Sequence, residues 1–360
     1  MPAGAGQSRE APEATARDGG GTGIWRFADR YGLPVPPPLR LSHGEGGTPM
    51  PAYPALAAAC GLEALWLKRE DLNPTGAHKA RGLAFQVAAL RALRPALSHL
   101  VISSSGNGAI AAASYAGLAG LRVVACVSPR TPTDKLNRLA ALGACVLLSE
   151  EAIALAEGLA QSRGWPNLRP SVDPLAPEGF MSLAWELQEA AAPAEGIFLF
   201  ASSGTGLVGL ARGLAHPAGG AWRAPLHVVQ GAGGDPIAAA FDRRPAPQEG
   251  RSMVGRLGSR KTRRLGEATR AVRESGGGGW TVGDAETLAA DALLRAAGVE
   301  AALEGAAALA AARRAAAETG LRRAIVIISG RAGAPAAAAD VPVTPVSDLE
   351  AVHRRLEAWL

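Results

Sequence analysis

The stretch HLVISSSGNGAIAAASYAGLAG, residues 99–120, contains the pattern that decides the fold of this chain. It begins with an apolar run at 99–105, passes through a serine- and glycine-rich loop, and continues as an alanine-rich segment opened by glycine. A short apolar run bounded by turn residues is typical of a buried strand, and the longer alanine-rich segment is typical of a helix. The stretch therefore predicts a strand, a loop and a helix in that order.

The same order recurs along the whole chain. Strand-like runs occur as ALWLKRE at 64–70, RVVACVS at 122–128, CVLLSE at 145–150, GIFLFASS at 196–203, PLHVVQG at 225–231 and RAIVIISG at 323–330. Apolar strands that alternate with helices pair in parallel and are covered on both faces. We therefore predict an α/β fold, in which ligands bind beyond the carboxyl ends of the strands. The loops rich in glycine and serine fall at those ends.

Composition and length favour a globular protein. Apolar residues make up 48% of the chain and charged residues 19%, so a buried core of ordinary size is expected. Residues 1–22 show no apolar period, and we expect them to form a disordered tail. The sequence shows no secretory signal and no run long enough to span a membrane. These features predict a protein of the cytoplasm without a membrane partner.

Charge and cysteine usage narrow the possible partners. The formal charge is +5, but the one basic cluster, residues 251–273, lacks interleaved aromatic residues and matches no nucleic-acid motif. We expect no nucleic-acid partner, and interpret the cluster as a solvated face or as a contact for an anionic substrate. Cys60, Cys126 and Cys145 have no metal-binding spacing, so buried free thiols and no metal site are expected.

The loop GTGLVG, with Gly204, Gly206 and Gly209, matches a dinucleotide-binding pattern between a strand and a helix. That pattern requires an acid on the next strand to bind the ribose hydroxyls, and no Asp or Glu occurs between Gly196 and Asp235. A nicotinamide cofactor is therefore disfavoured. A phosphate site remains, because free N–H groups at a helix N-terminus bind phosphate and the hydroxyls of Ser202, Ser203 and Thr205 lie beside them.

Lysine is rare in this chain, and one lysine lies in a loop of turn residues. Only Lys68, Lys79, Lys135 and Lys261 are lysines, against 33 arginines. Arginine stays protonated and cannot form an imine, whereas a desolvated lysine can lose its proton and attack an aldehyde. Lys79 in NPTGAHKARG, residues 73–82, is the candidate for this chemistry, with a chance surface lysine as the alternative.

The loop SSSGNGA, residues 103–109, is the third loop that we expect to contribute to a ligand site. It joins a predicted buried strand to a helix whose free N–H groups can bind a carboxylate, and Asn107 can donate to or accept from a ring oxygen. Taken together, the three loops supply an amine, a phosphate site and an amide. This combination predicts a phosphorylated aldehyde cofactor, and pyridoxal 5′-phosphate fits it.

Motifs over residues 23–329 resemble one known family. They are IWRF, GEGGTP, LWLKREDLNPTGAHKARG, SSSGNGAIAAASYAG, PTDKLNRLAALGA, EGFMSLAWEL and EGAAALAAA. In this order they are similar to pyridoxal-phosphate enzymes of the tryptophan synthase β fold (fold type II), most of all to threonine synthases. The resemblance implies two open, mostly parallel sheets flanked by helices, with the cofactor in the cleft between two domains. Residues 23–95 and 186–360 would form the larger domain, residues 96–185 the smaller one, and the protein would be a homodimer.

The resemblance also implies roles for individual residues. Lys79 would form a Schiff base with the cofactor and later move protons, Asn107 would contact the 3′-oxygen of its ring, and Ser329 would face the pyridine nitrogen. The phosphate would be bound by Ser203, Gly204, Thr205 and Gly206. The substrate carboxylate would be bound by Thr75, Ser104, Ser105, Gly106 and Asn107. Because a hydroxyl does not force a proton onto the ring nitrogen, Ser329 suits elimination from Cα carbanions.

Three positions depart from the threonine synthase pattern. Ala77-His78 stands in place of Ser-Phe before the lysine, Ala80 in place of an acid after it, and Glu304-Gly305 in place of Glu-Pro-Ser. Ala-His is the form found in tryptophan synthase β, so His78 either contacts the cofactor phosphate or packs as an ordinary imidazole.

The resemblance thus implies a lyase or synthase acting on a small amino acid with a leaving group at Cβ or Cγ. O-phosphohomoserine is the lead substrate, with Arg260 and Lys261 as candidate partners for its phosphate. The alternatives are a serine/threonine dehydratase and a β-replacement enzyme. More distant alternatives are an NAD(P)-dependent oxidoreductase and a non-catalytic binding protein.

Overall fold

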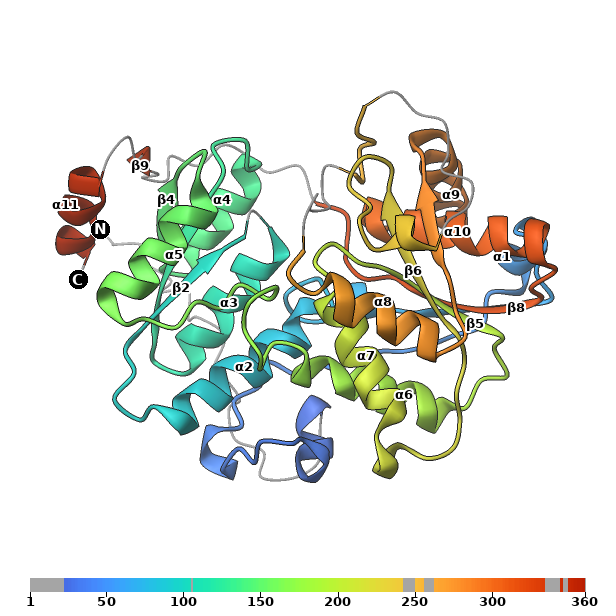
Figure 1. Cartoon of the computed structure of the whole chain (residues 1–360), viewed down its shortest axis with the longest axis horizontal. Coiled ribbons are helices and arrows are strands. Elements are labelled where there is room, and N and C mark those ends of the chain that lie inside the picture. The colour runs from blue at the N-terminus through green and yellow to red at the C-terminus, as the bar shows by residue number, and fades with distance from the viewer. Residues whose placement is uncertain are drawn as a thin grey trace, which may run out of the picture.

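The computed structural model describes residues 23–104, 106–241, 250–255, 262–333, 344–345 and 349–359. The predicted tail, Ser105, Arg260 and Lys261 lie outside the described residues, as does part of the basic cluster at 251–273. Figure 1 shows two parts side by side, each built on its own sheet, with helix α2 (Lys79–Leu93) in the region between them.

A five-stranded sheet forms the core of the larger part. Its strands, in spatial order, are β1 (Ala64–Lys68), β8 (Arg323–Ile327), β5 (Gly196–Phe200), β6 (Leu226–Gly231) and β7 (Gly279–Val282). All neighbouring strands run parallel. Parallel strands share one carboxyl edge, so the loops that follow β1, β8 and β5 lie next to one another.

Helices cover both faces of this sheet. One face packs against α1 (Pro54–Ala59), α9 (Asp284–Ala296) and α10 (Leu303–Thr319), and the other against α6 (Met181–Ala190), α7 (Thr205–Ala215) and α8 (Leu265–Glu274). Along β5, Phe198 and Phe200 point to the first face, and Ile197 and Leu199 to the second. The strand is apolar throughout because both of its faces are buried.

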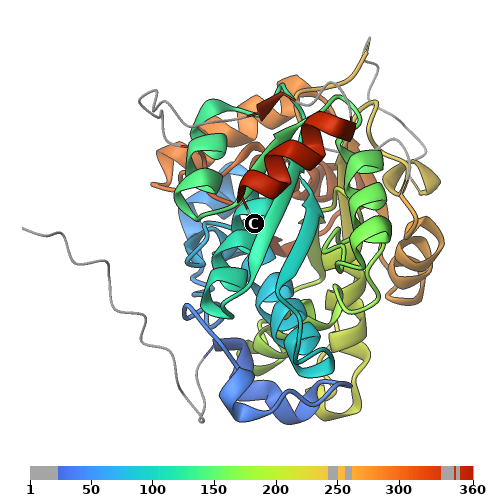
Figure 2. The same ribbon diagram turned by 90° about the vertical axis from the view of Figure 1, so that its left-hand side faces the viewer.

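A four-stranded parallel sheet forms the core of the smaller part. Its strands are β2 (His99–Ser103), β3 (Arg122–Val127), β4 (Cys145–Leu148) and β9 (Thr344–Pro345). Helices α2, α3 (Asn107–Leu118) and α4 (Thr133–Ala141) pack on one face, and α5 (Ala152–Arg163) and α11 (Leu349–Trp359) on the other. Figure 2 shows α11 lying in front of this sheet. The predicted fold class, two open parallel sheets flanked by helices, is confirmed.

The predicted domain division is wrong for the last segment of the chain. It assigned all of residues 186–360 to the larger domain, but β9 pairs with β4 and α11 packs on the smaller sheet. The physical reason is burial, because Val352 and Leu356 of α11 are fully buried in the same apolar cluster as Val101 and Leu147. The remaining boundaries stay a prediction.

Shorter elements complete the described structure. The 3-10 helices are η1 (Gly23–Arg30), η2 (Pro37–Leu39), η3 (Glu70–Leu72), η4 (Glu178–Phe180), η5 (Pro217–Gly219) and η6 (Ala238–Ala240). The three cysteines are buried free thiols, as predicted. Within the described ranges, no helix is both long and apolar enough to span a bilayer, and no cluster of His, Cys, Asp and Glu could hold a metal ion.

Candidate active site

Lys79 is the first residue of α2 and is half-buried. Its Nζ makes no hydrogen bond or ion pair within the described residues. Burial lowers the pKa of Lys79, the carboxylate of Glu304 opposes this effect, and the ammonium of Lys135 adds to it. A lowered pKa increases the population of the neutral amine, which is the form that attacks an aldehyde or accepts a proton.

The loop before Lys79 is joined to the end of β8. Ala77 forms an antiparallel bridge with Gly330, and the backbone N–H of His78 donates to the carbonyl of Ser329 at 3.0 Å. The ring Nδ1 of His78 lies 2.8 Å from the same carbonyl. Since a carbonyl only accepts, Nδ1 carries the proton and Nε2 is left as the free ring nitrogen. Ser329 is therefore held beside the loop that carries Lys79.

Asn107 and Ser104, which follow strand β2 of the smaller sheet, also lie near Lys79 and the end of β8. A methyl group built on Gly330 would lie 3.2 Å from Asn107 Nδ2, so the missing side chain leaves room for this amide. A methyl group on Gly108 would lie 2.8 Å from Ser104 Oγ and 3.6 Å from Lys79 Cδ. The N-terminus of α3 therefore faces the lysine. This helix has neither a side-chain cap nor an acid in its first turn.

The predicted phosphate loop lies on the other side of His78. Helix α7 begins at Thr205, after Gly204 with φ of 83°, and has neither a side-chain cap nor an acid in its first turn. A methyl group on Gly206 would lie 3.4 Å from His78 Nε2, so the free nitrogen of His78 faces this N-terminus. Unpaired N–H groups at such a terminus favour an anion.

The two hydroxyls of this loop are partly engaged. Thr205 Oγ1 donates to the carbonyl of Pro170 at 3.0 Å and lies 2.9 Å from Ser203 Oγ. Thr205 is also almost fully buried. The backbone N–H groups after Gly204 are thus more available to an anion than the Thr205 hydroxyl, which holds the loop against the 170–173 segment.

A buried ion network fixes the start of α2. Arg81, two residues beyond Lys79, donates to both oxygens of Glu70 at 2.7 and 2.8 Å and to both oxygens of Glu186 at 2.8 and 2.7 Å. Lys68 Nζ also donates to Glu186, at 2.6 Å. Burial raises the pKa of Glu186, but the charges and hydrogen bonds of Arg81 and Lys68 together outweigh burial and lower that pKa to about 2. The first turn of α2 cannot move without breaking these contacts.

Buried polar atoms at this site lack partners, and the set of donors fits pyridoxal phosphate. Thr75 Oγ1 and Ser171 Oγ are buried without a hydrogen-bond partner among the described residues. Buried hydroxyls are normally satisfied, so their state indicates a site that binds a polar ligand. The two uncapped helix N-termini can bind a phosphate and a carboxylate, and the free imidazole nitrogen of His78 lies beside the start of α7. The amine of Lys79 can react with an aldehyde, and the amide of Asn107 can bond to an oxygen on a ring.

Residues 41–330 match the family described as pyridoxal-phosphate dependent enzymes, and the chain belongs to this family. Its cofactor is therefore pyridoxal 5′-phosphate. Solved structures of the same fold include a pyridoxal 5′-phosphate-dependent aspartate racemase, with a TM-score of 0.66 at 20% identity over 82% of this chain and 93% of that one. Maize serine racemase gives a TM-score of 0.66 at 21% identity over 86% of this chain and 92% of the racemase chain.

Curated relatives come from two kinds of enzyme. The "serine dehydratase-like" protein of Mus musculus is 36% identical over 174 residues, 46% of this chain and 51% of the relative. The L-serine dehydratase/L-threonine deaminase of Homo sapiens is 34% identical over 46% of this chain and 52% of the relative. The threonine synthase of Methanosarcina acetivorans is 31% identical over 46% of this chain and 41% of the relative. The chain thus spans about half the length, or less, of these relatives.

Lys135 was not among the predicted site residues. It lies in the first turn of α4, and a methyl group built on Gly106 would lie 3.3 Å from its Nζ. The scarcity of lysine was the signal that could have identified it, since two of the three described lysines, Lys79 and Lys135, lie at this site. The third, Lys68, is bound in the buried ion network.

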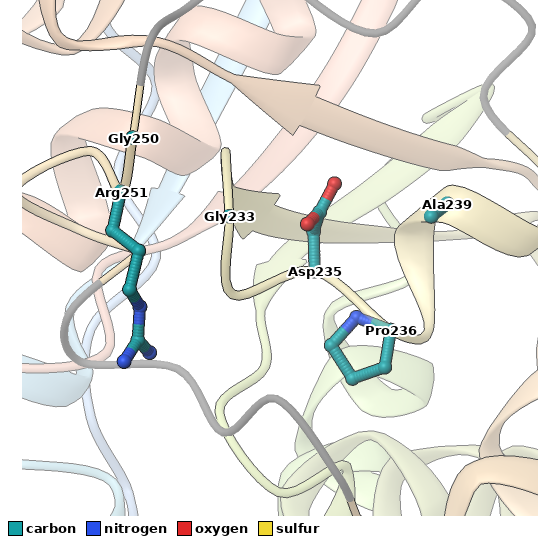
Figure 3. A pocket seen from close by; sticks show the side chains of 6 residues that line it. All are labelled: Gly233, Asp235, Pro236, Ala239, Gly250 and Arg251. Atoms are coloured by element: carbon teal, nitrogen blue, oxygen red, sulfur yellow. The ribbon is translucent and has the colours of Figure 1, made fainter.

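Two arginines in the described part of the basic cluster bind nearby loops. Arg264 donates to the carbonyls of Pro170 and Asp173 and pairs with Glu267. Arg251 lines a separate cavity of about 440 Å³ beyond the end of β6, opposite Asp235 (Figure 3). Its Nη2 donates to the carbonyl of Gly255 at 2.6 Å. Both arginines therefore make contacts that hold loops of the larger part.

Proposed function

We propose that this enzyme is a lyase that removes a leaving group from Cβ or Cγ of a small amino acid. The observation that supports it most is the placement of Lys79, a lysine of lowered pKa without a partner among the described residues, between Asn107 and the end of β8. Pyridoxal phosphate, when bound, supplies the electron sink that stabilises a carbanion at Cα. The protein must then provide a base, an anion site for the carboxylate and a dry cavity.

Each role has a candidate among the described residues. The neutral amine of Lys79 accepts the proton from Cα and returns a proton later. The N–H groups at the start of α3, together with the hydroxyls of Ser104 and Thr75, bind the substrate carboxylate and fix which bond at Cα is broken. His78 and the start of α7 would hold the cofactor phosphate, and the hydroxyl of Ser329 would serve the cofactor ring without forcing its protonation.

Two reactions remain candidates within this class. The lead is conversion of O-phosphohomoserine and water to threonine and phosphate, which the resemblance to threonine synthases supports. The second is dehydration of serine or threonine, which would yield a 2-oxo acid and ammonia. The similarity to the "serine dehydratase-like" protein of Mus musculus favours this second candidate.

Product analysis separates the candidates. The purified enzyme is incubated in turn with O-phosphohomoserine, serine, threonine and O-acetylserine, and amino acids, 2-oxo acids, ammonia and phosphate are measured. Threonine plus phosphate from the first substrate is the result the lead predicts, and a 2-oxo acid plus ammonia from serine or threonine identifies a dehydratase. No product from any of them, with cofactor bound at Lys79, contradicts the proposed lyase. The Lys79→Ala variant serves as the inactive control.

We also propose a homodimer in the cytoplasm, on the resemblance alone. Light scattering of the purified protein measures the first part directly, and a monomeric mass would refute it.

A further inference from the structure

The cavity beyond the end of β6 has a volume of about 440 Å³, which is a size typical of sites for small molecules (Figure 3). None of the described residues that line it is assigned above to the cofactor or the substrate. They are Gly233, Asp235, Pro236, Ala239, Gly250 and Arg251. The cavity is therefore a candidate for a second ligand.

Two opposite charges line this cavity. Figure 3 shows the guanidinium of Arg251 on one wall and the carboxylate of Asp235 on another. The hydroxyl of Thr281 donates to one oxygen of Asp235 at 2.8 Å and fixes the carboxylate. A carboxylate so held can still accept from an ammonium, and a planar guanidinium matches a carboxylate. A cavity with both charges favours a ligand that also carries both.

The two charged walls are held together by the backbone. The N–H of buried Ser252, the residue after Arg251, donates to the carbonyl of Ala232 at 2.9 Å. Gly233 has a φ of 76°, and a methyl group there would lie 2.9 Å from Arg251 Cγ, so its missing side chain lets the arginine stem approach. Walls that are already in place lower the entropy cost of binding a ligand.

The segment between Asp235 and Ala239 also supports the phosphate loop. Buried Gln230 donates from Nε2 to the carbonyl of Ala201, just before that loop, at 2.7 Å. Gln230 Oε1 accepts from the N–H groups of Ile237 and Ala238 at 2.8 and 2.9 Å. In addition, the loop residue 204 approaches this segment, since a methyl group there would lie 3.0 Å from Ile237 Cδ1. A ligand that moves this wall of the cavity therefore acts on the phosphate loop.

We propose that this cavity is a regulatory site that binds a free amino acid as a zwitterion, with its ammonium on Asp235 and its carboxylate on Arg251. The bound amino acid acts on the phosphate loop through Gln230 and Ile237. A small neutral side chain suits the site, because the other lining residues are glycine, proline and alanine. The inference goes beyond the proposed lyase function and does not depend on it.

Equilibrium dialysis with labelled alanine tests the site on the holoenzyme after borohydride reduction. Alanine has no leaving group, and a cofactor fixed to Lys79 cannot exchange that lysine for the probe. We expect one alanine bound per chain. Asp235→Asn and Arg251→Met should each weaken binding about 10-fold or more, the effect of losing one charge-assisted hydrogen bond. The exposed change Arg130→Met, on the smaller part, should leave binding unchanged.

Matched analogues test the two charges on the wild type alone, so the result does not depend on the folding of any variant. Propionate keeps only the carboxylate of alanine and ethylamine only its ammonium, and each should bind at least about 10-fold more weakly than alanine. No binding of alanine to the reduced wild type, binding that both variants retain, or equal binding of propionate would overturn the proposal.

The absorbance of the reduced cofactor tests the regulatory role in the same titration. A change that saturates with the dissociation constant found by dialysis, and that Asp235→Asn weakens to the same extent, supports action on the phosphate loop. An unchanged spectrum at full occupancy would overturn the regulatory role. Because the reduced enzyme does not turn over, neither result depends on which reaction the enzyme catalyses.

Discussion

His78 is the side chain that connects the end of β8 with the phosphate loop. Burial together with the nearby ammonium of Lys79 lowers the pKa of His78 to about 4. A bound phosphate next to Nε2 favours the protonated ring, so we expect this pKa to rise by about one unit or more when the cofactor binds. NMR titration of the ring protons with and without cofactor measures the change. An unchanged pKa would mean that His78 is an ordinary packed imidazole.

At the residue scale, local sequence context was enough to propose part of the candidate site. Asn107 and the glycines of the phosphate loop come shortly after strands, and Lys79 stands in a loop of turn residues, so all of them could be proposed from the sequence. The hydrogen bonds of His78 to Ser329, 251 residues away, depend on the pairing of β8 with β1 and could not. The same holds for Lys135, whose place beside Gly106 depends on the pairing of β2 with β3.

At the element scale, the buried ion network of Arg81, Glu70, Glu186 and Lys68 fixes the position of the first turn of α2. Arg81 lies in the first turn of α2, and its ion pairs hold that turn in place; its loss would leave the charges of Glu70 and Glu186 buried with only Lys68 to compensate them. We expect Arg81→Met to lower the free energy of unfolding by about 3–5 kcal/mol.

Chemical denaturation measures this change, with Arg130→Met as the matched control. Arg130 pairs with Glu150 at 2.9 Å, but both side chains are exposed, at 81% and 63%. Its removal should change the free energy of unfolding by less than about 0.5 kcal/mol. Equal effects of the two variants would contradict the structural role of the network.

Close helix packing behind the phosphate loop gives a second prediction at this scale. A methyl group on Gly209 of α7 would lie 2.2 Å from the carbonyl oxygen of Pro177, a backbone atom that cannot move aside, whereas one on Gly158 of α5 meets nothing within 4 Å. Gly209→Ala should therefore destabilise the protein by about 1–3 kcal/mol, and Gly158→Ala should stabilise it by about 0.5–1 kcal/mol. Unfolding curves of the two variants test both signs.

Some details of the elements cannot be inferred from a local sequence pattern. Residues 178–190 form the 3-10 helix η4 followed by α6, and Gly179 packs so closely that a methyl group there would lie 2.2 Å from the carbonyl oxygen of Arg81. Strand β9 has only two residues and thus no detectable period. Its place beside β4 follows from the packing of α11, which no local pattern reveals.

At the scale of the whole molecule, buried neutral histidines predict sensitivity to acid. Burial lowers the pKa of His227 to about 4, and its Nδ1 accepts from Trp280 Nε1 at 3.1 Å. The unfolded chain takes up this proton near pH 6.5, so stability is fully present above 6.5 and falls as the pH drops toward 4, by at most about 3 kcal/mol.

Unfolding measured at pH 7, 6 and 5 tests this effect with His227→Asn, which keeps an acceptor but does not titrate. The variant should lose less stability than the wild type between pH 7 and 5. An unchanged slope would refute the assignment, and the exposed His43→Asn change serves as the control.

Both sheets contribute residues to the candidate site. The smaller sheet contributes Asn107 and Lys135, the larger one contributes Ser329 and the α7 terminus, and α2 places Lys79 between them. Fold class was predictable from the alternation of strands and helices. The joining of the two halves was predictable only by resemblance, because it depends on contacts between segments far apart in sequence.

The most direct test of this account is the absorbance spectrum of the purified protein with pyridoxal phosphate, before and after borohydride reduction, followed by peptide mapping. We predict a visible band that borohydride removes, with the reduced cofactor attached to Lys79 and to no other lysine. A spectrum unchanged by added cofactor, or attachment to Lys135 instead, would contradict the assignment of Lys79 as the reacting amine.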